Sequence, residues 1–228
     1  MLAEKDDNKY ILCHVGANVG EEVDGYALSR SIKEVVLVEA NSLVIPLIKR
    51  KIESITEKYK KGVDLSKFHV INELVSDKKE EFLFNIYDKS VEGSKFPEYG
   101  LSSIYKLNNR RLSKDTVLVK KEKMISCTLD EALESSGIEP STLDLLVLDV
   151  QGNELNVLKG FHHIENLKII TTEYSHKISE RDDLYPDGCG LEELIDFLNK
   201  KGFYEMPNIR RYKKKHGNTI FINSRNKV

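Results

Sequence analysis

The feature that most constrains this chain is a glycine turn placed directly after a short apolar segment near the N-terminus. Residues 11–15 have the length and apolar content of a strand buried on both faces. Gly16 and Gly20 follow, and glycine lets a backbone turn sharply and approach a ligand closely. Doubly wound α/β sheets bind nucleotides at such a turn, at the carboxyl edge of the first parallel strand. The segment therefore predicts an α/β fold with a nucleotide-type cofactor at this turn.

The spacing of the glycines argues against a dinucleotide as that cofactor. The dinucleotide fingerprint needs glycine at Gly16 and again at the positions that Asn18 and Glu21 occupy. A helix start binds pyrophosphate through free N–H groups and a positive dipole end, and here Glu21 and Glu22 add negative charge. S-adenosylmethionine has no phosphate and carries a sulfonium and an ammonium group, so an acidic rim favours it. A plain strand-to-helix turn without a ligand is the alternative interpretation.

Length and composition predict a single α/β domain. At 228 residues with 40% hydrophobic content, the chain can bury one sizeable core. A net charge of −2 gives no general attraction to nucleic acid or to anionic membranes. The first ten residues are polar, and no apolar run has the length of a membrane span. Three scattered cysteines indicate reduced thiols, so we expect a cytoplasmic protein.

Two further apolar segments place candidate ligand contacts beside the glycine turn. Residues 35–38 read as a buried strand that ends at Glu39, where a carboxylate can accept hydrogen bonds from both ribose hydroxyls. A solvated carboxylate is the alternative for this residue. Residues 68–71 begin a third strand, and Leu74 and Val75 follow at the edge where an adenine ring would lie.

The C-terminal half supplies two more strands and two more carboxylates. Residues 143–150 read as a central strand that contains Asp149, and residues 168–174 bring Glu173 to the same edge. A carboxylate at the end of an apolar strand is costly unless it is hydrogen-bonded or open to a cleft. Because this central strand neighbours the first strand in a doubly wound sheet, we expect Asp149 to face the glycine turn.

Residues 78–126 interrupt the alternation of strands and helices with extended segments around a loop. Insertions at the binding edge of a sheet commonly determine substrate specificity. Ser102 and Ser103 lie in this loop, where a simple turn is the alternative interpretation. Residues 210–215 form a basic cluster that could contact a phosphorylated or nucleic-acid substrate, although a solvated hairpin tip is the favoured interpretation.

Several short motifs follow one another along the chain: His14-Val-Gly-Ala-Asn-Val-Gly20, Val-Glu39-Ala, Ser76-Asp77, Ser102-Ser103, Thr128-Leu-Asp130 and Leu148-Asp149-Val-Gln-Gly-Asn-Glu154. Their order and spacing resemble the FkbM family of S-adenosylmethionine-dependent methyltransferases. The resemblance covers roughly nine-tenths of the chain. Two positions depart from it, because the family commonly has Asp where His14 stands and often Glu where Gln151 stands.

The resemblance implies a Rossmann-like class I methyltransferase fold, with a seven-stranded, mostly parallel sheet whose last strand is antiparallel and a β-rich insertion after strand 3. It implies one methyltransferase domain over residues 1–228, with residues 78–126 as the substrate-side insertion. The implied cofactor is S-adenosyl-L-methionine. The implied reaction is methyl transfer to a hydroxyl of a sugar, glycan or related small molecule.

The predicted site residues fall into three groups. The cofactor-binding group comprises His14, Gly16, Ala17, Asn18, Gly20, Glu39, Ala40, Leu74, Val75 and Asp149. The catalytic candidates are Asp149, which would orient the sulfonium end or act as the base, and Glu173 and His176 as further candidates for the base. The acceptor-side candidates are Ser102, Ser103 and Tyr185.

Three alternatives remain open at this stage. A divalent cation held by Asp149, Glu173 and His176 could polarise the acceptor, but no short ligand motif marks such a site. A non-catalytic domain of the same fold would bind cofactor or a partner without an acceptor pocket. A nicotinamide-dependent reductase is disfavoured by Asn18 and Glu21 at the fingerprint positions. We expect no nucleic-acid partner and no membrane span.

Overall fold

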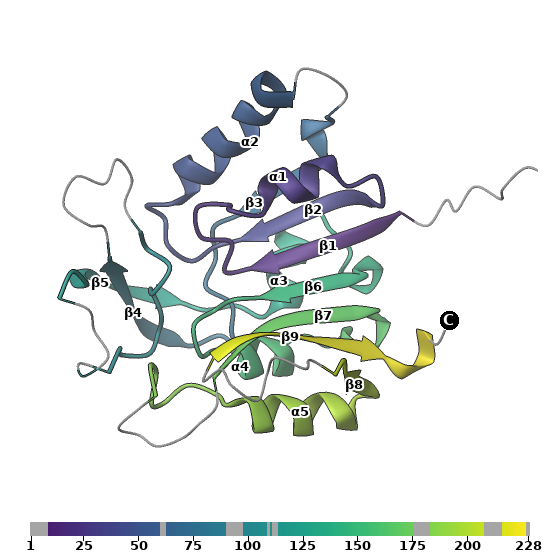
Figure 1. The fold of residues 1–228 in the computed structure, drawn as a ribbon. Helices are drawn as coiled ribbons and strands as arrows, with labels where there is room; N and C mark the ends of the chain where they lie inside the picture. The colour runs from purple at the N-terminus through teal and green to yellow at the C-terminus, as the bar shows by residue number, and fades with distance from the viewer. Residues whose placement is uncertain are drawn as a thin grey trace, which may run out of the picture.

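The computed structural model describes residues 9–59, 63–89, 98–108, 110, 114–175, 183–207 and 216–226. One sheet is built from strands β1 (Tyr10–Val15), β2 (Ile32–Val38), β3 (Phe68–Ile71), β6 (Leu145–Leu148), β7 (Ile169–Ser175), β8 (Phe203–Glu205) and β9 (His216–Asn223). Its seven strands lie in the order β3-β2-β1-β6-β7-β9-β8 (Figure 1). β9 pairs antiparallel with both neighbours, so the other six strands run parallel to one another. This confirms the Rossmann-like sheet that was predicted, including its antiparallel last strand.

The two faces of the sheet are covered by helices α1 (Val23–Leu28), α2 (Ile45–Tyr59), α3 (Leu129–Ser135), α4 (Glu154–Lys159) and α5 (Leu191–Lys200) (Figure 1). Successive side chains of a strand point to opposite faces. In β2, Val35 and Leu37 pack in one core with α1 and α2, whereas Val36 and Val38 pack in a second core with α3, α4 and α5. Burial on both faces explains why these strands are short, continuous apolar runs.

The segment between β3 and α3 contains a second, antiparallel sheet of β4 (Glu81–Asp88) and β5 (Val117–Ile125). This confirms the β-rich insertion. It lies beyond the carboxyl ends of β1 and β2 (Figure 1). The Ser103 backbone forms an isolated bridge with Asn85, and the Ser103 hydroxyl donates to the Gln151 carbonyl at 2.8 Å. The insertion is therefore fastened to the turn that follows β6.

Some local features differ from the sequence-based expectation. β3 ends at Ile71, and Val75 instead forms a single bridge with Cys127. The loop in between is held because the Asn72 side-chain amide donates to the carbonyls of Glu39 and Ala40, at 2.8 and 3.1 Å. β8 carries no period-2 pattern long enough to predict, since it has only three residues. Side-chain and backbone hydrogen bonds, rather than strand propensity, set these boundaries.

Two glycines allow crowding and backbone strain to be separated. Gly160 ends α4 at φ −80°, but a Cβ there would come 2.3 Å from the Ser76 carbonyl oxygen. Gly137 has φ +75° and nothing near its would-be Cβ. We predict that Gly160→Ala lowers the free energy of unfolding by about 3 kcal/mol, because the backbone at Ser76 must move to make room for the methyl group. Gly137→Ala should lower it by about 1 kcal/mol, because a left-handed backbone conformation disfavours alanine but no atom is crowded. Urea denaturation compares them, and equal losses would contradict this account.

Candidate functional site

A cleft of about 280 Å³ opens at the carboxyl edge of the main sheet. Its walls come from the turn after β1, the ends of β2 and β6, the loop after β3, and the insertion. All of the predicted cofactor-binding residues except Gly20 line it: His14, Gly16, Ala17, Asn18, Glu39, Ala40, Leu74, Val75 and Asp149. Residues that are distant in sequence therefore meet around one cavity.

Glu39 connects the glycine turn to the end of β2. Its buried carboxylate accepts the N–H of Asn18 at 2.8 Å on one oxygen and the N–H of Asn41 at 2.7 Å on the other. Burial raises the pKa of Glu39, while these two donors act in the opposite direction. Asn18 itself has φ +45°, a conformation that this hydrogen bond helps to hold. Each carboxylate oxygen retains a further lone pair that a ligand hydroxyl can use.

Gly16 marks the place where the turn after β1 meets the turn after β6. It has φ +85°, and a Cβ there would lie 1.9 Å from the Asp149 carbonyl oxygen. The Asp149 N–H donates to the Val15 carbonyl at 3.0 Å, which continues the pairing of β1 with β6. Gly20 has φ +76° and lies outside the cleft lining, so its contribution is to the shape of the turn. The structure places Asp149 beside the glycine turn, as the strand order predicts.

The side-chain amide of Gln151 joins two of the predicted catalytic carboxyl groups. Its nitrogen lies 2.5 Å from an Asp149 carboxyl oxygen and 2.8 Å from a Glu173 carboxyl oxygen. Burial, and then the charge of Asp149, raises the pKa of Glu173 to about 9, so Glu173 is protonated at neutral pH. Asp149 and Gln151 line the cleft, whereas Glu173 is not among the lining residues. The third candidate, His176, lies outside the described residues.

His14 contributes a neutral group to the cleft wall. Its side chain is buried, and burial lowers its pKa to about 4. Its Nδ1 lies 3.2 Å from the Tyr26 hydroxyl. At neutral pH the imidazole can therefore exchange a hydrogen bond but supplies no positive charge.

The hydroxyls proposed for the acceptor side already have partners within the protein. Ser103 donates to the Gln151 carbonyl, Ser102 accepts the Tyr87 N–H at 3.2 Å, and the Tyr185 hydroxyl donates to the Leu101 carbonyl at 2.7 Å. Of these three hydroxyl residues, Ser102 lines the cleft. The hydrogen bonds shape the insertion and the turn after β6, and the predicted contacts with an acceptor stay a prediction.

Sequence reasoning gave too little weight to the residues that hold the turn after β6. One Glu154 carboxyl oxygen accepts the N–H groups of Val150 and Gly152, each at 3.1 Å. The Asn153 amide donates to the Val75 carbonyl at 3.0 Å, which ties this turn to the loop after β3. In the sequence, the only indication of this role is an acidic residue two positions after Gly152. An acidic residue is also favoured at a helix start, so this pattern alone does not identify the role of Glu154. Phe84, Tyr99 and Ile104 also line the cleft, and no pattern in the sequence marks them.

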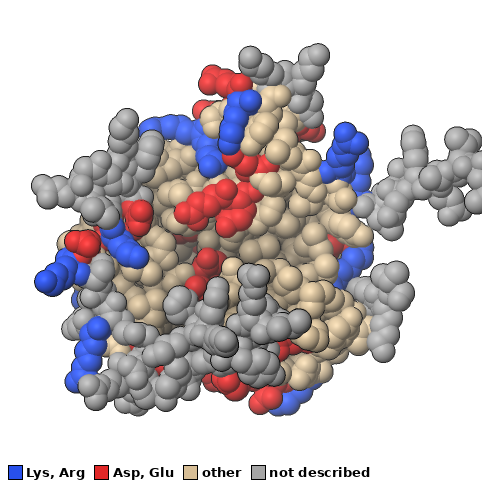
Figure 2. Space-filling model, viewed as in Figure 1, with Lys and Arg blue, Asp and Glu red and all other residues tan. Residues whose placement is uncertain are grey.

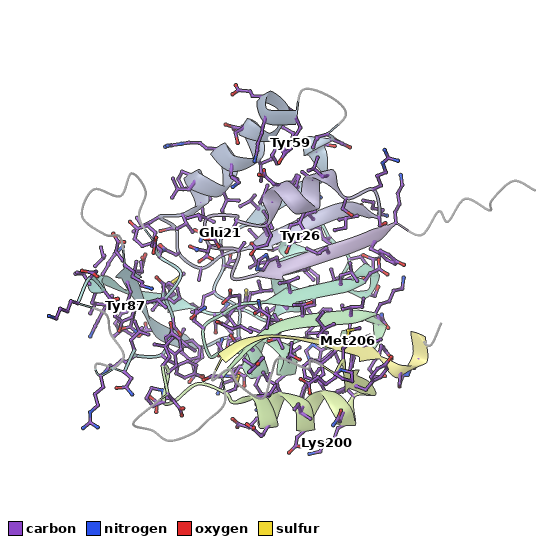
Figure 3. All side chains as sticks on the ribbon, in the orientation of Figure 1. Glu21, Tyr26, Tyr59, Tyr87, Lys200 and Met206 are labelled. Atoms are coloured by element: carbon purple, nitrogen blue, oxygen red, sulfur yellow. The ribbon has the colours of Figure 1, made fainter. Side chains whose placement is uncertain are left out.

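The cleft is acidic. Its lining includes the carboxylates Glu21, Glu22, Glu39, Glu73 and Asp149, and no Lys or Arg is among the described lining residues. Acidic side chains gather in the middle of the face shown in Figure 2, in the region where Figure 3 labels Glu21. Such a lining favours a ligand with positive charge over a phosphate.

The described residues contain neither a metal-type cluster nor a membrane-spanning helix. No three His, Cys, Asp or Glu side chains within the described ranges are grouped so that they could hold a metal ion. No helix in the same part of the chain has the length and apolar character needed to cross a membrane.

Comparison with known proteins places this geometry in context. A family model described as "Methyltransferase FkbM domain" matches residues 14–217. No curated protein matches the chain. Among solved structures, an FkbM methyltransferase from Methylobacillus flagellatus KT superposes with a TM-score of 0.53 at 10% identity, covering 94% of this chain and 44% of that one. The present chain thus spans less than half of that protein.

Two other solved structures are more distant. A magnesium protoporphyrin IX methyltransferase from Synechocystis PCC 6803 with bound SAH has a TM-score of 0.45 at 10% identity, covering 95% of this chain and 74% of that one. An rRNA methylase from Streptococcus thermophilus has a TM-score of 0.46 at 8% identity, covering 95% of this chain and 88% of that one. At these values neither bears on the acceptor of this chain.

The burial of His14 leads to a prediction about stability and pH. Its pKa is about 4 in the folded protein against 6.5 as the ordinary value, so between these values the unfolded chain binds the extra proton. Stability is therefore lost as the pH falls through this window. From pH 7 to pH 5, we expect wild type to lose about 2 kcal/mol more than His14→Gln does. Urea denaturation at both pH values measures this, and parallel losses would contradict it.

Proposed function

Because the chain belongs to the FkbM methyltransferase family, we propose that it is an S-adenosylmethionine-dependent O-methyltransferase acting on a hydroxyl of a sugar, glycan or related small molecule. The observation that carries the proposal is the contact between the Glu39 carboxylate and the Asn18 N–H at 2.8 Å. This hydrogen bond joins the glycine turn to Glu39, the carboxylate expected to bind the ribose. Both residues line the same cleft, although 21 positions separate them in the sequence. The acidic lining adds support, because the cofactor is cationic and has no phosphate.

The cofactor would extend along the carboxyl edge of the sheet. Gly16, Ala17 and Asn18 would contact its methionine portion, and Glu39 would accept hydrogen bonds from its ribose hydroxyls. Leu74 and Val75 are both buried and line the cleft next to Phe84, which supports an apolar surface for adenine there. In this arrangement the chain forms one domain over residues 1–228, and residues 78–126 are its acceptor side.

Catalysis in this proposal rests mainly on positioning. S-Adenosylmethionine supplies an electrophilic methyl group on its sulfonium. The cleft must hold an acceptor hydroxyl in line with the carbon–sulfur bond, so that a carbon–oxygen bond forms as the carbon–sulfur bond breaks. Asp149 lines the cleft with an exposed side chain and can accept the proton that the hydroxyl loses. Tyr99, Ser102 and Ile104 from the insertion would border the acceptor.

A first prediction concerns the cofactor site. Calorimetric titration should show one-site binding of S-adenosylhomocysteine and no binding of NADH. We expect Glu39→Ala to weaken S-adenosylhomocysteine binding by about 100-fold, because it removes a buried, charged hydrogen-bond acceptor. Glu53→Ala is the matched control, since Glu53 is exposed on α2 and outside the cleft. Absence of binding by the wild type would contradict the proposed function and favour a domain that binds other partners.

A second prediction concerns Asp149. If its carboxylate faces the sulfonium, Asp149→Asn should weaken S-adenosylmethionine binding by about tenfold, because the attraction between opposite charges is lost. Binding of S-adenosylhomocysteine, which is neutral at sulfur, should change by less than about twofold. The two dissociation constants for each protein give the comparison. A loss of the same size for both ligands would place Asp149 away from the sulfonium.

A further inference from the structure

We propose that Gln151 is a positioning residue: its side-chain amide holds Asp149 and Glu173 together and thereby fixes the Asp149 carboxylate at the cleft. The bridge is a feature of the structure, and its meaning for methyl transfer rests on the proposed function.

The geometry of the bridge is the first support. The amide nitrogen lies 2.5 Å from Asp149 and 2.8 Å from Glu173, and both partner atoms are carboxyl oxygens. A glutamine amide has two N–H groups, so it can satisfy both contacts at once. Asp149 follows β6 and Glu173 lies in β7, so the amide connects two neighbouring strands. The amide thereby links a carboxyl group of the cleft wall to one in the neighbouring strand.

The backbone around Gln151 holds the amide in place. Gln151 has φ +55°, a left-handed conformation that is uncommon outside glycine. The adjacent N–H groups of Val150 and Gly152 both donate to Glu154, and the Gln151 carbonyl accepts the Ser103 hydroxyl. Contacts from α4 and from the insertion therefore hold the backbone from which the Gln151 side chain extends, as a positioning role requires.

The charges of the surroundings explain why a donor is needed at this position. Four of the described groups lie near Glu173. Asp149 and Gln151 belong to the turn after β6, Glu154 belongs to α4, and Tyr185 is the fourth. All of these neighbours are acidic or neutral, and no Lys or Arg is among the described residues that line the cleft. Burial raises the pKa of Glu173, the more buried partner, and Asp149 is the partner that lines the cleft. A glutamate at position 151 would replace the donor by a third carboxyl group.

The chain allows the bridge to be observed directly, because Gln151 is its only glutamine. Protein made with side-chain ¹⁵N-glutamine should give a single pair of amide proton signals. We expect both protons to be shifted downfield from those of free glutamine and to exchange slowly with solvent, because each is donated to a carboxyl group. Asp149→Asn and Glu173→Ala should each alter the pair, and neither change adds a second glutamine. Signals at the positions of a free, rapidly exchanging amide would overturn the proposal.

A binding experiment tests whether the bridge positions Asp149. We expect Gln151→Met to weaken S-adenosylmethionine binding by about tenfold and to change S-adenosylhomocysteine binding by less than about twofold, because Asp149 is no longer held. Lys159→Met, an exposed change on α4, is the control and should change neither affinity. An unchanged ratio of the two affinities in Gln151→Met would overturn the positioning role.

The two experiments keep this proposal separate from the proposed function. If the wild type binds neither S-adenosylmethionine nor S-adenosylhomocysteine, the proposed function fails, and the amide signals still decide whether the bridge exists. If both ligands bind and the amide signals are those of a free side chain, the proposed function stands and the role of Gln151 is wrong. Near-ultraviolet circular dichroism of Gln151→Met checks that a lost affinity does not come from unfolding.

Discussion

The close contact between the turn after β1 and the turn after β6 determines where every other part of the cleft can lie. Pairing of β1 with β6 brings the two turns together, and Gly16 leaves no room for a side chain beside the Asp149 carbonyl. Glu39 then connects the first turn to β2, and Glu154 closes the second turn on itself. The cleft is thus built from backbone groups held by buried carboxylates, a rigid arrangement suited to a reaction that depends on positioning.

Burying several carboxyl groups close together is unfavourable unless each has a hydrogen-bond donor or a proton. Glu39, Glu154 and Glu173 all have a pKa raised chiefly by burial, and Asp149 adds a further carboxyl group to the wall of the cleft. Backbone N–H groups satisfy Glu39 and Glu154. Glu173 is satisfied by a proton and by the Gln151 amide. A cationic ligand would complete this balance, which agrees with S-adenosylmethionine better than with a dinucleotide.

Much of this arrangement could be predicted because local patterns carry it. Short apolar runs predict the parallel strands, and the strand order of such sheets then brings Asp149 to the glycine turn. Thr128 followed three positions later by Glu131 is the local pattern of a capping box, and the structure has both of its hydrogen bonds, at 2.8 and 3.2 Å. The roles of Gln151 and Ser103 could not be predicted, because their partners lie on other elements and long-range packing alone decides the contacts. Phe84 and Tyr99 reach the cleft for the same reason.

The most direct test of the central claim is a crystal structure of the protein with S-adenosylhomocysteine. The account predicts electron density for the ligand in the cleft, with both ribose hydroxyls at hydrogen-bond distance from the Glu39 carboxylate. It also predicts the sulfur on the side of Asp149 and the adenine against Leu74 and Val75. Ligand density at another place on the molecule, or a ribose that makes no contact with Glu39, would contradict the account.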